Sequence, residues 1–171
     1  RAISSTLIIA RSEYKYVADV KTDFQDLPPV TCHGGQINQV VLNLVVNAAD
    51  AVLSEGSAGG VRVRVRPAVL GSRPGDVRDA GAARRRPDAV ECEVADQGAG
   101  IAPEDRERLF DPFFTTKAPG EGTGLGLANS LRLAEELQGA LELVETPEGF
   151  RTAFVLRLVA AADPASDCAP R

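Results

Sequence analysis

The stretch QINQVVLNLVVNAADAV, from Gln36 to Val52, has the length and the residue spacing of an amphipathic helix. Apolar side chains recur along it every three or four residues and would gather on one face of the helix. This face consists of Ile37, Val40, Val41, Leu44, Val45, Ala48, Ala51 and Val52. We expect it to pack on a hydrophobic core, and the rest of the fold to be arranged around it.

The opposite face of this helix carries amides where a surface helix would carry lysine and glutamate. Its members follow one another by three or four residues and are Gln36, Gln39, Asn43, Asn47, Asp50 and Ser54. A carboxamide oxygen is a hard donor that can complete the shell of a magnesium ion whose other ligands are phosphates and water. The same side chains could instead bond to neighbouring backbone along a helix edge. This helix alone leaves both interpretations open.

A second motif, DQGAGI from Asp96 to Ile101, follows a segment in which Cys92 and Val94 alternate with glutamates. The alternation predicts a strand that ends in a carboxylate. Gly98 and Gly100 permit a sharp turn and would let a planar ligand approach the backbone. Asp96 could then accept a hydrogen bond from an exocyclic amine such as adenine N6. The alternative is an ordinary Asp-Gly turn.

A third motif, GEGTGLGL from Gly120 to Leu127, runs into a segment with helical spacing of leucines. A glycine-rich loop that feeds the start of a helix presents free backbone N–H groups to an anion, and phosphate fits. The loop is not a Walker A motif, because no Gly-Lys-Ser/Thr follows. No downstream ribose-binding acid completes a dinucleotide fingerprint either.

Together with DPFFTTK, from Asp111 to Lys117, these motifs resemble the N, G1, F and G2 boxes of sensor histidine kinases, in the same order. The similarity extends from about Tyr16 to Leu158, and the ordered set is far more specific than any single motif. It implies the Bergerat ATP-binding fold, shared with type II topoisomerases, MutL and Hsp-type chaperones. The expected architecture is α+β, a two-layer α/β sandwich with a mixed, mostly antiparallel sheet covered on one face by helices.

The resemblance implies the ATP-binding catalytic domain of a two-component kinase, which transfers the γ-phosphoryl of Mg-ATP to a histidine on a separate dimerisation domain and releases ADP. Asn43 favours this branch, because hydrolytic relatives carry a glutamate there to activate water. The implied partners are the dimerisation and phosphoacceptor domain of the same kinase and the receiver domain of a response regulator. A conformational ATPase and a nucleotide-free docking module are the alternatives.

Carried over by position, the resemblance implies Asn47 as the magnesium ligand, with the catalytic Asn43 one turn earlier and Asp50 further along the groove. Asp96 would read adenine, and the second catalytic residue, Lys117, would close on phosphate from a lid. The other implied nucleotide-binding residues are Gly98, Gly100 and Ile101 near the base, Phe113, Thr115 and Thr116 in the lid, and Gly122, Thr123, Gly124, Leu125, Gly126 and Leu127 around the triphosphate.

The lid is expected from about Ala102 to Thr123, with Phe113 and Phe114 as its hinge and also as a hydrophobic plug. Prolines would act as stiff joints in this mobile segment. They are Pro103, Pro112 and Pro119.

The expected domain organisation has three parts. Residues 1–15 would be a short helix or linker from a dimerisation domain, residues 16–158 the ATP-binding domain, and residues 159–171 a disordered tail or linker. Further strands are expected at Tyr16–Phe24, Val61–Val65, Ala89–Ala95, Leu141–Glu145 and Arg151–Leu158. Clustered arginines between two of these strands are interpreted as a solvated hairpin loop. They are Arg73, Arg78, Arg84, Arg85 and Arg86.

Composition excludes several classes of function. The 171 residues carry a net charge of −5, which argues against a nucleic-acid surface. No apolar run reaches bilayer length, so we expect no direct membrane contact and a cytoplasmic domain, whose parent protein can still be membrane-anchored. The cysteines Cys32, Cys92 and Cys168 are far apart and are interpreted as reduced thiols. His33, the only histidine, is expected to be a loop or cap residue and not the phosphoacceptor.

Overall fold

The computed structural model describes residues 2–14, 16, 18–56, 59–71, 87–118 and 120–161. The helices are α1 (Ala2–Tyr14), α2 (Gly34–Ser54) and α3 (Gly126–Glu136), with a 3-10 helix, η2, at Pro103–Arg108. The strands are β1 (Ala18–Phe24), β2 (Gly59–Ala68), β3 (Ala89–Asp96), β4 (Ala140–Leu143) and β5 (Thr152–Val159). Each helix and strand expected from the sequence is present, with its ends shifted by a few residues, and η2 is an addition.

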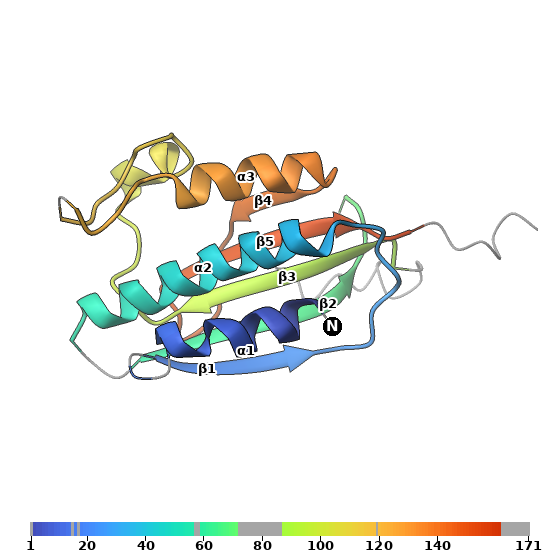
Figure 1. Ribbon diagram of the computed structural model, residues 1–171, viewed down its shortest axis with the longest axis horizontal. Coiled ribbons are helices and arrows are strands. Elements are labelled where there is room, and N and C mark those ends of the chain that lie inside the picture. Colours follow the sequence, from blue (N-terminus) through green and yellow to red (C-terminus); the bar gives the residue numbers. More distant parts are fainter. Residues whose placement is uncertain are drawn as a thin grey trace, which may run out of the picture.

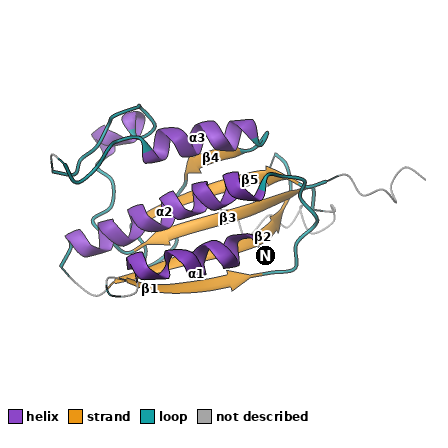
Figure 2. Ribbon diagram, in the orientation of Figure 1, coloured by secondary structure: helices purple, strands orange, loops and turns teal. Residues whose placement is uncertain are grey.

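The strands form one five-stranded sheet in the order β1-β2-β3-β5-β4. β1 pairs with β2 in parallel, and the other neighbours are antiparallel. The long helices lie over one face of this sheet (Figure 1), and the colouring by element type shows one helical layer over one strand layer (Figure 2). The predicted α+β sandwich, with a mixed and mostly antiparallel sheet, is confirmed.

α2 lies between α1 and α3 in the helical layer, and its buried side chains form the centre of the core against the sheet. Its buried residues are Ile37, Val40, Val41, Leu44, Val45, Ala48, Ala49 and Val52. This helix is long and apolar enough to cross a membrane, but helices buried in the core of a protein have the same length and composition. Leu7 and Ala10 of α1 belong to the same core. The first helix therefore packs with the rest of the described chain, while its origin in a dimerisation-domain linker stays a prediction.

The C-terminal end of the sheet extends slightly beyond the expected limit of residue 158. β5 includes Val159, and the amides of Ala160 and Ala161 donate to Asp88 O and Pro29 O. Residues 162–171 of the expected tail (159–171) lie outside the described residues, as do the arginine cluster between β2 and β3, Pro119 and Cys168.

The face of the sheet away from the helices is charged. On β2, valines point to the core while Arg62, Arg64 and Arg66 occupy the other face, as the alternation predicts. On β3, however, Glu91 and Glu93 are only 2% and 4% exposed. The alternation did not predict this burial, which arises because arginine side chains from both neighbouring strands fold over the carboxylates.

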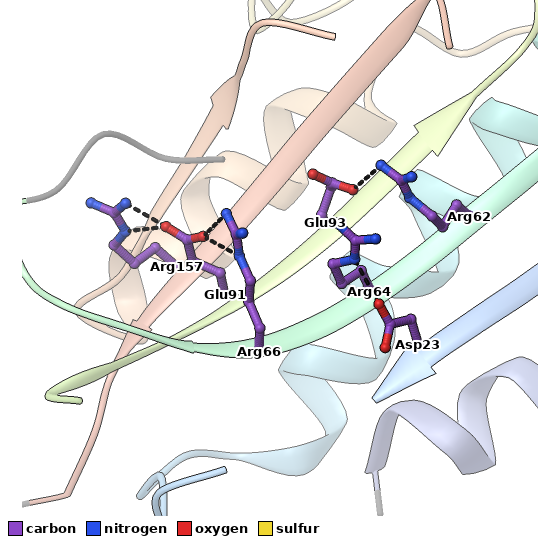
Figure 3. Close-up of polar contacts among 7 residues, drawn as sticks. All are labelled: Asp23, Arg62, Arg64, Arg66, Glu91, Glu93 and Arg157. Carbon is purple, nitrogen blue, oxygen red and sulfur yellow. Dashed lines mark hydrogen bonds and ion pairs between the residues drawn. The ribbon is translucent and has the colours of Figure 1, made fainter. Parts of the chain in front are cut away.

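Glu91 lies between two guanidinium groups in Figure 3. Arg66 on β2 donates to one of its oxygens at 3.0 and 3.1 Å, and Arg157 on β5 donates to the other. A second pair, Arg62 with Glu93, is 2.8 Å long. A buried carboxylate of this kind is tolerated only while its partners remain, because an unpaired buried charge is costly.

We therefore expect Glu91→Ala to lower the free energy of unfolding by about 3 kcal/mol, because the buried Arg66 and the partly buried Arg157 lose their acceptor. The matched control is Glu142→Ala, which removes an exposed glutamate from β4 and should change stability by less than about 0.5 kcal/mol. Urea denaturation monitored by circular dichroism measures both. Equal, small effects of the two substitutions would show that the network contributes nothing to stability.

Candidate functional site

The polar face of α2 runs along α3, with the two helices in opposite directions. Near the start of α2, Gln36 Nε2 donates to Glu136 Oε2 at the end of α3, at 2.8 Å. Close to the midpoint of α2, Asn43 Nδ2 donates to Ser130 Oγ at 3.1 Å. Further along, Asn47 Nδ2 lies 3.8 Å from the position that a Cβ on Gly126 would take. The amide helix thus reaches the first turn of α3 at Asn47.

The ligand-binding interpretation of this amide face stays a prediction, but part of the face bonds within the protein. Its first half is a helix-to-helix seam, in which Gln39 Nε2 donates to Asn43 Oδ1 at 3.1 Å and the Asn43 amide donates to α3. Asn47, one turn later, is half-buried, and no hydrogen bond of its side chain occurs within the part of the chain that the structure describes. Its amide oxygen is therefore available to a ligand beside the first turn of α3.

Asp50, the next member of this face, forms an ion pair with Lys117 of the predicted lid. Lys117 was expected to meet phosphate, and in this structure its ammonium group contacts the Asp50 carboxylate instead. Both side chains remain partly exposed. The contact joins the lid to α2 and leaves the lysine free to exchange its partner for another anion.

We expect Asp50→Asn to accelerate amide hydrogen exchange in residues 111–118 of the ligand-free protein, because the lid loses its ionic contact with α2. Exposed ion pairs are weak, so the increase should be only about two- to fivefold. Arg132→Gln breaks the exposed pair of Arg132 with Glu136 on α3 and serves as the control. Unchanged exchange in the Asp50 variant would show that the ion pair does not hold the lid.

Asp96 is the last residue of β3 and is 4% exposed. Its Oδ1 accepts a hydrogen bond from Gly98 N at 2.9 Å, and the side chain of Thr152 bonds to the same carboxyl group. Burial raises the pKa of Asp96 above its ordinary value, and these two hydrogen bonds oppose the rise. The carboxyl group is thus held in one orientation in a largely dry environment.

Thr152 is a site residue that sequence reasoning missed. It is 4% exposed, begins β5 and stands directly opposite Asp96 in the β3–β5 register. The available signal was a single hydroxyl at the start of a strand that is apolar except for Arg157. The partner of that hydroxyl becomes evident only when the register is known.

The turn after Asp96 is pressed against α2. A Cβ on Gly98 would stand 2.4 Å from the carbonyl carbon of Ala51, and Ala99 N donates to Ala51 O at 3.3 Å. The sequence suggested that Gly98 makes room for a ligand, whereas here the α2 backbone fills that space. Gly100 has φ of +80° and supplies the left-handed residue of the turn.

The two lid phenylalanines differ. Phe114 is half-buried against the core, with the Arg108 guanidinium 4.6 Å from its ring centroid. Phe113 is 74% exposed and has φ of +68°, a left-handed conformation unusual for an aromatic residue. In this structure only Phe114 packs as the expected hydrophobic plug, and Phe113 does not.

The glycine loop folds back on the lid. Phe113 N donates to Gly124 O at 2.9 Å, and a Cβ on Gly124 would stand 2.4 Å from the Phe113 carbonyl carbon. A Cβ on Gly122 would stand 2.8 Å from Thr115 Oγ1. The loop glycines thus allow close packing of the lid against the start of α3.

The remaining predicted residues surround this junction. Ile101 and Leu127 pack partly buried against the core, and Leu125 caps α3. Thr123 Oγ1 accepts from Leu125 N at 3.4 Å, while Thr116 is exposed. His33 occupies the N-cap position of α2, is exposed and makes no side-chain capping bond, in agreement with its expected place at the helix entry.

No group of three or more histidine, cysteine, aspartate or glutamate side chains is placed to hold a metal ion among the described residues. A cation at Asn47 would therefore need most of its oxygen ligands from a bound molecule and from water. An amide with a free oxygen fits magnesium in such a setting, because Mg²⁺ usually keeps several waters and binds through few protein groups.

Comparison with known proteins agrees with this geometry. Residues 33–161 match the family model described as histidine kinase-, DNA gyrase B- and HSP90-like ATPase. The two-component sensor PprA of Pseudomonas aeruginosa is 42% identical over 127 residues, covering 74% of this chain and 12% of that protein. The sensor kinase CckA of Brucella abortus is 42% identical over 123 residues, covering 71% of this chain and 12% of that protein. The chain thus spans about an eighth of the length of these relatives.

Solved structures show the same fold. The mycobacterial sensor histidine kinase MprB has a TM-score of 0.67 at 24% identity, with 92% of this chain and 91% of that chain covered. Full-length ShkA in complex with AMPPNP has a TM-score of 0.68 at 25% identity, with 95% of this chain and 30% of that chain covered. With the family model covering most of its length, the chain belongs to the histidine kinase-, DNA gyrase B- and HSP90-like ATPase family.

Proposed function

We propose that this chain is the ATP-binding catalytic domain of a two-component sensor kinase and transfers the γ-phosphoryl of Mg-ATP to a histidine on a separate dimerisation domain. The observation that carries the proposal is the free amide of Asn47 beside the first turn of α3, with an asparagine and not an acid one turn earlier at Asn43. An amide cannot act as a general base for water, which disfavours a conformational ATPase.

The adenine end of the site would be at Asp96. Its buried carboxylate is fixed by Gly98 N and Thr152, and this fixed acceptor can distinguish the exocyclic amine of adenine from the carbonyl of guanine. A preorganised buried acceptor discriminates strongly, because the wrong base leaves it without a donor. The complex of the similar protein ShkA with AMPPNP supports a nucleotide at this type of domain.

The phosphate end would lie between Asn47 and the glycine loop. The amides at the start of α3 offer hydrogen-bond donors to phosphate oxygens, and the helix dipole favours an anion at that end. Magnesium, when bound, would neutralise phosphate charge in the transition state. Lys117 would leave Asp50 and contact phosphate, so the lid would be held by the nucleotide and not by α2.

The phosphoacceptor would come from a partner domain. His33 occupies the N-cap position of α2, fourteen residues before Asn47. At about 1.5 Å per helical residue, the two residues are about 21 Å apart. It cannot approach a phosphate held at Asn47 for in-line attack. We infer that the phosphoryl group passes to a dimerisation domain of the same kinase and then to the receiver domain of a response regulator, in the cytoplasm.

The two ends of the site can be tested separately. We expect Asn47→Ala to weaken ATP binding about tenfold in the presence of magnesium and little in EDTA, because the lost group is a metal ligand. We expect Asp96→Asn to weaken ATP binding at least tenfold in both conditions, because it removes a charged acceptor for the base. Isothermal titration calorimetry with ATP and GTP measures both effects. Equal affinity of the wild-type chain for ATP and GTP would remove the adenine-reading role of Asp96.

Phosphoryl transfer needs the partner. Incubated with radiolabelled Mg-ATP, the chain alone should remain unlabelled and hydrolyse ATP very slowly, whereas a separate polypeptide carrying the dimerisation helices of the parent kinase should become labelled on histidine. Asn47→Ala should abolish that label, and Asn129→Ala, on the exposed face of α3, should not. Strong labelling of the isolated wild-type chain that His33→Ala removes would contradict the proposal, and rapid ATP hydrolysis without transfer would favour the conformational ATPase.

A further inference from the structure

Ser130 is a fully buried polar residue in α3, with an exposed fraction of 0%. Its hydroxyl donates to Gly126 O at 2.8 Å, one helical turn earlier, and accepts from Asn43 Nδ2 of α2 at 3.1 Å. The same Asn43 nitrogen also donates to Gly126 O at 3.3 Å. Two of these hydrogen bonds join α2 to α3, and the third lies within the first turn of α3.

The donors and acceptors of this cluster form a single directional chain. Gln39 donates to the Asn43 oxygen, the Asn43 nitrogen donates to Ser130 Oγ and to Gly126 O, and the Ser130 hydroxyl donates to Gly126 O. Both contacts of the Asn43 nitrogen lie on the α3 side, and the single hydrogen of the Ser130 hydroxyl is used within α3. The orientation of the Asn43 amide is therefore fixed by α3 and not by a ligand.

The position of this cluster gives it a consequence for the site. Gly126 ends the glycine loop and begins α3, and a Cβ on it would stand 3.8 Å from Asn47 Nδ2. The cluster therefore sets the separation between Asn47 and the backbone amides at the start of α3. A shift of the first turn of α3 would change that separation directly.

The hydroxyl is not required for packing alone. Ala134, one turn further along α3, is buried against the same core without any polar group. A buried hydroxyl gains little net stability, because its hydrogen bonds replace bonds to water. Its benefit is geometric, since hydrogen bonds define distance and direction in a way that apolar contacts do not.

We propose that Ser130 is a positioning residue: through Asn43 it clamps the first turn of α3 to α2 and so aligns the phosphate-binding backbone with Asn47. This inference rests on the proposed nucleotide site. It assigns to Asn43 the task of holding α3, and it adds a residue that neither the motifs nor the family match single out. The clamp acts on the phosphate end of the site and not on the adenine end at Asp96.

The test compares Mg-ATP with adenosine, which lacks the phosphates, by isothermal titration calorimetry on the described chain. Ser130→Ala should weaken Mg-ATP binding about three- to tenfold, the range expected for loss of a hydrogen bond, and leave adenosine binding unchanged. The control Asn129→Ala changes the neighbouring, exposed residue of the same helix and should alter neither affinity. A merely structural role would lower both affinities together and would not change their ratio.

Two further variants keep the test decisive. Ser130→Thr retains the hydroxyl and should keep the wild-type ratio of the two affinities, even if its extra methyl lowers stability. In a double-mutant cycle, the variant with both Asn43→Ala and Ser130→Ala should lose no more Mg-ATP affinity than the more affected single variant, because the two groups act as one unit.

An unchanged ratio in Ser130→Ala would overturn the inference. So would a ratio lowered equally in Ser130→Thr, since side-chain volume and not the hydroxyl would then be responsible. Failure of the proposed nucleotide site is distinguishable from both results, because the wild-type chain would then bind neither Mg-ATP nor adenosine.

Discussion

The orientation of α2 about its own axis, meaning which of its faces is turned toward the sheet, is the constraint on which the rest of the structure depends. Eight of its side chains are buried, and burial of each large apolar side chain is worth about 1.5–3 kcal/mol, against about 0.5–1.5 kcal/mol for a typical hydrogen bond. The apolar face therefore decides which way the helix turns, and the amide face must follow. Because the two faces are opposite, packing on the sheet delivers Asn43, Asn47 and Asp50 to α3 and the lid.

The charged face of the sheet constrains the other side of the domain. A slip of one residue between strands would exchange the two faces and is excluded by the valines of β2. A slip of two residues keeps the faces, and the three arginines of β2 would tolerate it. Arg157 would not, because it is the one arginine on β5 and it stands directly opposite Glu91 in the β3–β5 register. The buried pair thus contributes more to register than to net stability, in line with the high desolvation cost of buried ion pairs.

The glycines of the motifs serve close packing within the protein as much as approach by a ligand. Gly98 admits the backbone of α2, and Gly124 admits the backbone of Phe113. In both places a side chain would collide with main-chain atoms, which cannot move aside as a flexible side chain can. The turn after β3 therefore packs on α2, and the lid packs on the loop that begins α3. These contacts bring motifs that are separate in the sequence together in space.

The sequence by itself determined the secondary structure, the helix-on-sheet layering and the family, because apolar periodicity and ordered motifs are local properties of the chain. It placed the two faces of α2 and the strand ending in Asp96 correctly. Only the tertiary structure decided which polar groups are satisfied by the protein: Asn43 is held by Ser130, Asp50 by Lys117, and Asp96 by Thr152, whereas the Asn47 side chain forms no hydrogen bond with any other described residue. These pairings join residues far apart in the sequence, and the exposure of Phe113 and the burial of Glu91 likewise depend on neighbours from other strands and loops. Spacing along one segment cannot specify them, since hydrogen-bond partners are set by the packing of separate elements.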